Sequence, residues 1–194
     1  MGINRDAWLR LDINITAAVL LIVVLFSTSL QSNRRHFGTR LFSGVVLSTI
    51  ALLLLEVIKW IFDGRVEHRG LVHVSNFWFL LLNPLPALFW VCYLDYRLKG
   101  SVERLRRRWF YSQPIIAVAV LMTASIPFDF VFYVDEFARY GRGPGLAGIA
   151  IANYGMIVYS LTLYWRNRDA ADRRLVSVLI AFAFIPAVGS TVQL

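Results

Sequence analysis

Residues 41–62 read LFSGVVLSTIALLLLEVIKWIF, a run with only two charged side chains, Glu56 and Lys59. At a rise of about 1.5 Å per residue, a helix of this length crosses the roughly 30 Å of hydrocarbon in a bilayer. In hydrocarbon every backbone N–H and C=O must be paired within the protein, and a helix does this without a partner. The stretch therefore predicts a membrane-spanning helix.

Five other runs share this length and apolar character. Hydrophobic residues make up 58% of the 194 positions and charged residues 16%, which is too apolar for an ordinary soluble domain. The sequence predicts an all-α integral membrane protein, in which residues 1–194 form one six-helix transmembrane bundle without a soluble output domain. The expected spans are 13–30, 41–62, 71–94, 109–128, 145–165 and 175–194.

The distribution of basic residues predicts how the bundle is oriented. Of the 20 Lys and Arg residues, thirteen lie in the links after the first, third and fifth spans, and six lie in the amino-terminal segment and the other two links. Under the positive-inside rule this bias puts the amino terminus outside the cell and the arginine-rich links in the cytoplasm. It also explains the net charge of +8 better than nucleic-acid binding does.

The third run contains two prolines, Pro84 and Pro86, which each remove an amide donor and disturb the preceding turn. We therefore expect a kink between Leu80 and Ala87. The single cysteine, Cys92, lies in the same run and is expected to be a small packing residue, because one cysteine allows neither a disulfide framework nor a thiolate metal site.

Charged residues inside a span are expensive and are candidates for function. The second run ends with Glu56, Lys59 and Asp63, whose spacing places all three on one helical face. Glu56 and Lys59 can pair. Such a pair can serve a binding site, or it can neutralise itself while Lys59 reaches the outer interface.

The third run presents His73, Asn76 and Asn83 along one stripe. These residues can contact a ligand or bond between helices, and for Asn83 beside a proline kink we favour the interhelical bond. With the orientation above, Asn83 lies near the bilayer centre and the other polar residues lie in its outer half or at its edge. This bias predicts a cavity that opens outward rather than a through-pore. The outer group comprises Glu56, Lys59, Asp63, His73, Asn76, Asn153 and Gln193.

The link before the fifth span, residues 132–144, reads FYVDEFARYGRGP and is expected to close that cavity from outside. It supplies carboxylate acceptors, amphipathic rings and a guanidinium before a helix start at Pro144. Two adjacent carboxylates without matched histidines do not predict a metal site, and no catalytic constellation is present, so we expect no cofactor. This link adds Tyr133, Asp135, Glu136, Tyr140 and Arg142 to the predicted ligand-binding set.

Taken together, several motifs resemble a bacterial membrane sensor region. This region has several helices, usually seven, and precedes GGDEF diguanylate cyclase domains or forms part of membrane histidine kinases. The likeness covers most of the chain from about Trp60 to Gln193, and its most specific part is the outer Tyr-x-Asp-Glu and Arg-Gly-Pro turn. The residues that carry it are Trp60, Asp63, Gly64, Asn83, Pro84, Trp90, Tyr93, Asp95, Tyr96, Phe132, Tyr133, Val134, Asp135, Glu136, Tyr140, Arg142, Gly143, Pro144, Pro186, Gly189 and Gln193.

The resemblance implies a sensor in the bacterial cytoplasmic membrane. It would detect an extracytoplasmic or membrane-borne small ligand and signal to an output domain that makes cyclic di-GMP or phosphorylates itself. The chain departs from the pattern because it lacks the seventh span and any GGDEF or kinase signature, so we expect no enzymatic activity of its own. The output domain would then follow in a longer gene or act in trans.

Two other functions stay open, a small transporter in which Glu56 and Lys59 take part in coupling, and a membrane scaffold. The transporter is disfavoured because the inner half lacks polar lining and no inverted repeat is apparent. The expected partners are the lipid bilayer, an unidentified small ligand and a cytoplasmic signalling domain, with a homodimer left open and nucleic acid excluded.

Overall fold

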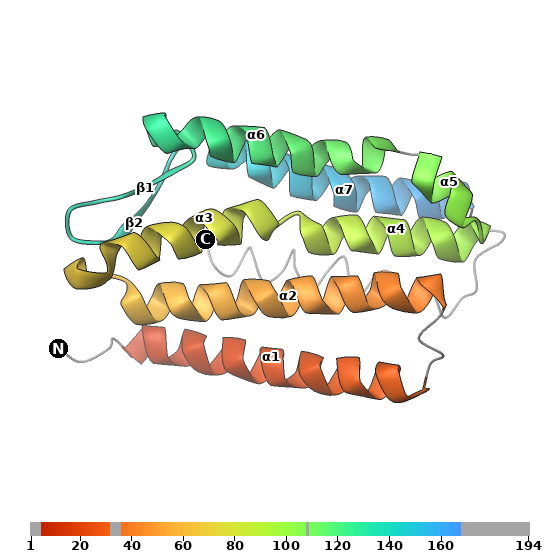
Figure 1. Ribbon diagram of the computed structural model, residues 1–194, viewed down its shortest axis with the longest axis horizontal. Helices are drawn as coiled ribbons and strands as arrows, with labels where there is room; N and C mark the ends of the chain where they lie inside the picture. Colours follow the sequence, from red (N-terminus) through yellow and green to blue (C-terminus); the bar gives the residue numbers. More distant parts are fainter. Residues whose placement is uncertain (1–4, 32–35, 108, 168–194) are drawn as a thin grey trace.

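The computed structural model describes residues 5–31, 36–107 and 109–167, and most of them are helical. The helices run side by side in an elongated antiparallel bundle, and a short β-hairpin lies at one end (Figure 1). In chain order the elements are α1 (Arg5–Gln31), α2 (Phe37–Phe62), η1 (Val66–His68), α3 (Arg69–Leu82), α4 (Leu85–Lys99), α5 (Val102–Arg107), η2 (Trp109–Ser112), α6 (Gln113–Phe128), β1 (Phe132–Val134), β2 (Tyr140–Arg142) and α7 (Leu146–Arg166).

The described helices pack in successive layers, of which the first two hold one helix each and the next two hold two helices each. Helix α1 packs on α2, which packs on α3 and α4, and these in turn contact α6 and α7. Two ends result. The hairpin end contains residues 63–68 and 129–145, and the arginine-rich end contains residues 36–40 and 97–107 (Figure 1). Links that were expected on the same side of the membrane therefore meet at the same end.

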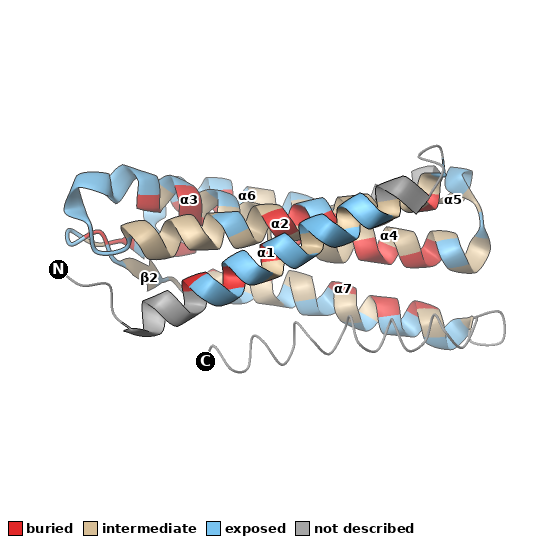
Figure 2. Cartoon of the chain, turned by 90° about the horizontal axis from the view of Figure 1, so that it is seen from below, coloured by how far each residue is buried: buried red, intermediate tan, exposed pale blue. Residues whose placement is uncertain are grey.

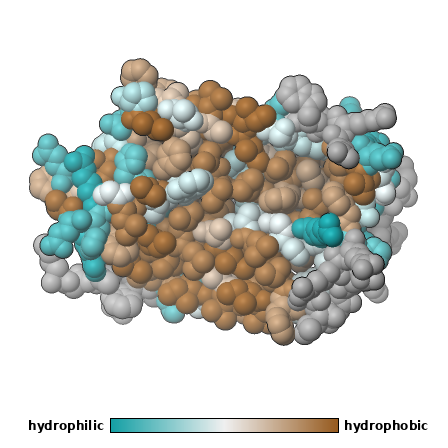
Figure 3. All heavy atoms as spheres, in the orientation of Figure 1, coloured by the Kyte–Doolittle hydropathy of each residue, from teal (hydrophilic) through white to brown (hydrophobic). Residues whose placement is uncertain are grey.

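The surface of the bundle is apolar along its length. Large side chains of α1 such as Ile13, Val23 and Phe26 are more than half exposed, and Figure 2 shows exposure along much of this helix. Figure 3 shows hydrophobic atoms over the length of the bundle and hydrophilic atoms gathered toward its ends. A continuous apolar surface of this extent is not found on soluble monomeric proteins and is typical of a surface that contacts lipid. The chain is therefore a membrane-associated helical protein.

Within the described ranges, four helical segments are long and apolar enough to cross a membrane. Helix α6 is apolar but shorter, and the predicted span 175–194 lies outside the described residues. The four segments are Leu11–Thr28, Phe37–Phe62, Val66–Lys99 and Leu146–Arg166.

Residues 41–62 form most of α2, as predicted, and this helix lies between α1 on one side and α3 and α4 on the other. Its hydroxyl groups bond the helix itself, with Ser48 Oγ 2.7 Å from the Gly44 carbonyl oxygen. A Cβ at Gly44 would lie 2.8 Å from the Phe89 ring of α4, so glycine lets these two helices approach closely.

The predicted kink of the third span is confirmed. Helix α3 ends at Leu82 and α4 begins at Leu85, with Asn83 and Pro84 forming the turn between them. Both halves count as one candidate span, so the proline break divides a crossing helix without reversing it.

The predicted boundaries of the fourth and fifth spans need two corrections. Residues 109–128 do not form one helix, because η2 covers Trp109–Ser112 and α6 begins at Gln113, where Pro114 occupies the first turn. Helix α7 begins at Leu146 after Gly145, so Pro144 lies in the preceding turn rather than in the helix.

The chain is mostly helical, as predicted, and residues 132–142 add a short antiparallel hairpin that the sequence did not predict. Tyr133 faces Gly141 and Val134 faces Tyr140 across its two strands. Phe132 and Val134 are buried and Tyr133 is exposed, which is the alternation of a half-buried strand. The Tyr133 ring occupies the space that a Cβ at Gly141 would need, because such a Cβ would overlap the Tyr133 Cζ atom. Glycine at this position therefore permits the pairing of the two strands.

Candidate functional site

The predicted polar residues of α2 do not pair as expected. Lys59 Nζ lies 4.1 Å from the centroid of the Phe79 ring and 5.1 Å from that of Tyr140. Among the described side chains Lys59 has no ion-pair contact with Glu56, although the charges of Glu56 and Asp63 still act on it. The ammonium lies near the end of α2, where it reaches ring faces of α3 and β2. Lys59 therefore links two helices and the hairpin.

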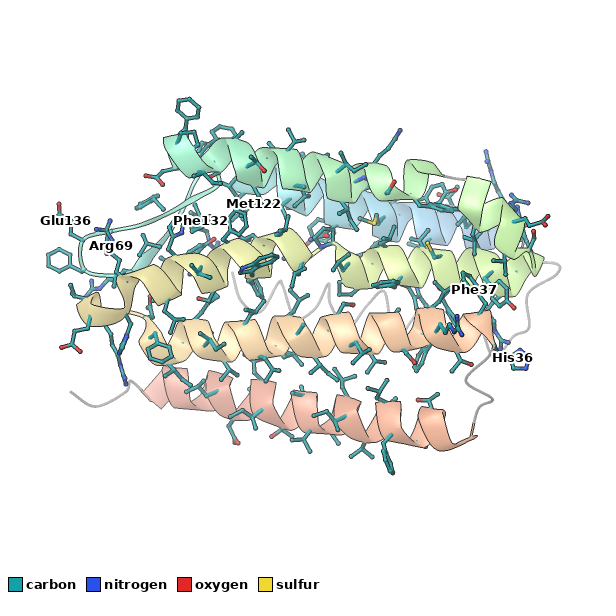
Figure 4. The ribbon with its side chains drawn as sticks, viewed as in Figure 1. His36, Phe37, Arg69, Met122, Phe132 and Glu136 are labelled. Carbon is teal, nitrogen blue, oxygen red and sulfur yellow. The ribbon has the colours of Figure 1, made fainter. Side chains whose placement is uncertain are left out.

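Aromatic rings continue this link into the hairpin. The Phe132 ring stacks on Tyr140 at 6.1 Å and packs against His73 of α3 at 5.0 Å. Figure 4 shows Phe132 beside Met122, and both belong to one buried cluster. Five of the predicted or neighbouring side chains thus form one connected group, which we call the aromatic cluster: Lys59, His73, Phe79, Phe132 and Tyr140.

Two hydrogen bonds to backbone carbonyl groups of the hairpin hold it against residues 64–69. Arg69 Nη2 donates a hydrogen bond of 2.9 Å to the Val134 carbonyl oxygen. The Gly64 amide donates to the Ala138 carbonyl oxygen at 3.1 Å. The hairpin therefore lies against this end of the bundle.

Asp135 shapes the hairpin loop. Its Oδ1 accepts a hydrogen bond of 2.7 Å from the Arg139 amide, and its own amide donates to the Arg139 carbonyl oxygen at 3.0 Å. Ala138 in this loop has a positive φ of 58° and is fully buried. The adjacent Glu136 is exposed and points away from the bundle in Figure 4. Of the two predicted acceptors, one is used by the loop and the other faces outward.

Burial raises the pKa of the Tyr140 hydroxyl above its usual value, and the positive charge of Arg142 opposes this effect. Tyr140 is therefore neutral at physiological pH and can donate or accept a hydrogen bond. Arg142 itself is exposed. Lys59 and Arg142 place two positive charges beside the Tyr140 ring, and the carboxylates of Glu56 and Asp63 lie close enough to act on Lys59.

The polar residues deeper in the bundle divide between two roles. Asn76 is fully buried, and its Nδ2 donates to the Val72 carbonyl oxygen of the same helix at 2.8 Å while its Oδ1 has no partner. Asn153 Nδ2 of α7 donates to Asn83 Oδ1 at 3.0 Å. The interhelical alternative for Asn83 is confirmed, and this bond ties the proline break to α7.

A narrow crevice without room for a water molecule lies near the hairpin end, between α3, α6 and β1. It is lined by His73 and Phe132 of the aromatic cluster and by Ser125, whose Oγ accepts a hydrogen bond from the Val131 amide. The remaining predicted residue, Gln193, lies outside the described residues.

The sequence-based site set omitted a buried carboxylate at the arginine-rich end. Asp95 of α4 is 2% exposed, and neither of its oxygens has a hydrogen-bond partner. Among the side chains that the structure describes, the cation beside it is Arg104 of α5, whose Nε lies 3.9 Å from Asp95 Oδ2. A buried carboxylate in a membrane protein is itself a signal of function or of pairing, and Asp95 had been noted only in the resemblance.

No protein-family model, curated protein or solved structure matches this chain.

Replacing Lys59 tests the role of the aromatic cluster. We expect Lys59→Met to lower the free energy of unfolding by about 1 kcal/mol, because the cation–π contacts are lost while the stem volume is kept. The hairpin should also loosen, measured as faster tryptic cleavage at Arg139. Glu56→Gln serves as the control and should change neither quantity, whereas equal effects of both variants would indicate that the Glu56–Lys59 interaction matters instead.

Proposed function

We propose that this chain is a membrane-embedded sensory module that detects a small ligand at its hairpin end. The proposal rests on the aromatic cluster. In it the half-buried Lys59 ammonium, the half-buried Tyr140 ring and the His73 imidazole lie beside the docked hairpin. Apolar ring faces with a few convergent polar groups are typical of small-molecule sites. The positive charges of Lys59 and Arg142 favour a ligand that carries a carboxylate or another anionic group.

The same proposal includes a topology. The chain would form a six-helix bundle in a bacterial cytoplasmic membrane, with the hairpin end outside and the arginine-rich end in the cytoplasm. Two of the links that are rich in Lys and Arg, residues 36–40 and 97–107, lie at the same end of the bundle, which supports this orientation. The resemblance to sensor regions adds the expectation of a GGDEF or kinase output domain in cis or in trans.

The signal would pass from the hairpin through α3 and α4 to the arginine-rich end. Helix α3 contacts the hairpin through His73, and the Asn83–Pro84 break separates α3 from α4. Helix α4 carries Asp95 to the arginine-rich end. A ligand that binds one tilt of α3 better than another would shift the position of α4 relative to α5, because an equilibrium moves only through differential contacts.

The test is ligand-dependent stability of the purified protein in neutral detergent, measured against a panel of small carboxylates, amino acids and sugars. A specific ligand at one hundred times its dissociation constant should add about 2.7 kcal/mol to the free energy of unfolding. We expect Lys59→Met and Tyr140→Phe to reduce this gain and Lys99→Gln, at the opposite end, to keep it. A panel with no stabilising compound, or a gain unchanged in Lys59→Met, would contradict the proposal.

A further inference from the structure

A cavity lies at the end opposite the aromatic cluster. It has a volume of about 450 Å³ and opens between α1, α2 and α4. This volume is within the range of small-ligand sites. The polar residues that line it are Thr28 of α1, His36 and Thr39 at the start of α2, and Tyr93, Tyr96 and Arg97 of α4.

The wall of this cavity is held in place by aromatic contacts. The Phe37 ring meets Tyr96 edge-on at 5.4 Å, and Phe42 packs on Tyr93 at 5.9 Å. The Arg97 guanidinium lies over the Tyr93 ring at 6.0 Å. In Figure 4 His36 and Phe37 lie together where α2 begins. The cavity is therefore built from side chains whose positions depend on one another.

The charge of the lining selects the class of ligand. The described lining contains one permanent cation, Arg97, and His36, but no Asp or Glu. A planar guanidinium with nearby phenol and imidazole groups supplies donors for a tetrahedral oxyanion. The cavity also lies at the basic end of an apolar bundle, where pockets between helices commonly take lipid headgroups.

We propose that this cavity binds a phosphate ester through Arg97, His36 and Tyr96. The same chemistry has two sources, the headgroup of an anionic phospholipid and a soluble organic phosphate. The lipid source fits the position of the cavity at one end of the apolar surface, with α1 as one wall. The site is separate from the aromatic cluster and does not depend on the sensory role.

The experiment uses the full chain in neutral detergent micelles, with the thermal midpoint recorded as short-chain phosphatidylglycerol is added. We expect Arg97→Gln to bind about tenfold more weakly, because a charge-assisted contact is lost. Arg97 is exposed, so this variant should fold normally. Lys99→Gln removes the same charge from the same helix outside the cavity, and its affinity should stay within about twofold of the parent.

Two further additions distinguish the sources of the phosphate. Stabilisation by phosphatidylglycerol, but not by glycerol 1-phosphate, supports the site with a lipid headgroup as its ligand. Equal stabilisation by glycerol 1-phosphate supports the site with a soluble ligand. Equal stabilisation by neutral phosphatidylcholine would overturn the proposal, as would an equal loss in Arg97→Gln and Lys99→Gln, which would indicate a diffuse effect of surface charge.

Discussion

Gly143→Ala is expected to destabilise the protein by about 3 kcal/mol, with the loss concentrated in the hairpin. A Cβ at this position would lie 2.2 Å from the Phe130 carbonyl oxygen, and the Gly143 amide bonds the Val131 carbonyl oxygen at 2.9 Å. Backbone cannot move aside as a flexible side chain does, so the two segments must separate. Thermal unfolding measures the loss, and tryptic cleavage at Arg139 reports on the hairpin.

The control is Gly155→Ala in α7, where an added Cβ meets nothing within 4 Å. A helical glycine in open space should gain about 0.5–1 kcal/mol when it becomes alanine. Equal behaviour of the two variants would show that residues 130 and 143 are not in close contact, and the docked hairpin would then be wrong.

Arg104→Gln is the second substitution with a large expected effect. It removes the cation that pairs with Asp95 among the described side chains; the Asp95 side chain is 1% exposed and the Arg104 side chain is 34% exposed. Breaking such a pair from one side leaves a buried carboxylate without compensation, which costs about 3 kcal/mol at the lower end of measured values. Thermal unfolding at neutral pH should show the loss.

A second substitution checks the cause. Adding Asp95→Leu to Arg104→Gln removes the charge that Arg104 compensates and should restore most of the lost stability. If the double variant is as unstable as Arg104→Gln alone, Arg104 acts through its own packing or through Ser101, whose Oγ accepts a hydrogen bond from the Arg104 amide at 3.3 Å.

The sequence predicted the long elements of the fold because length and apolar character determine them. The run at 41–62 became α2 since a helix alone satisfies its backbone, and Pro84 divided the third span since it removes an amide donor at a fixed place. The hairpin could not be predicted in the same way. Its strands have three residues each, and their pairing depends on the fit of Tyr133 over Gly141.

The candidate site was predicted in part for a related reason. Helical spacing placed Lys59 and His73 at the correct end, but their partners belong to other elements, and only packing decides that Lys59 meets rings rather than Glu56. The partner of Asn83 is seventy residues away in α7, and nothing local indicates it. Asp95 was overlooked since its burial depends on how α5 folds back over α4.

We propose that the hairpin end, with its aromatic cluster, faces the outside of the cell. The most direct measurement replaces Cys92 by alanine and introduces one exposed cysteine, Glu136→Cys in the hairpin loop or Glu103→Cys in α5. Intact cells are then treated with a maleimide that does not cross membranes. We predict labelling of the Glu136→Cys protein in intact cells and of the Glu103→Cys protein only after permeabilisation. The reverse pattern would place the hairpin end in the cytoplasm and overturn the proposed orientation.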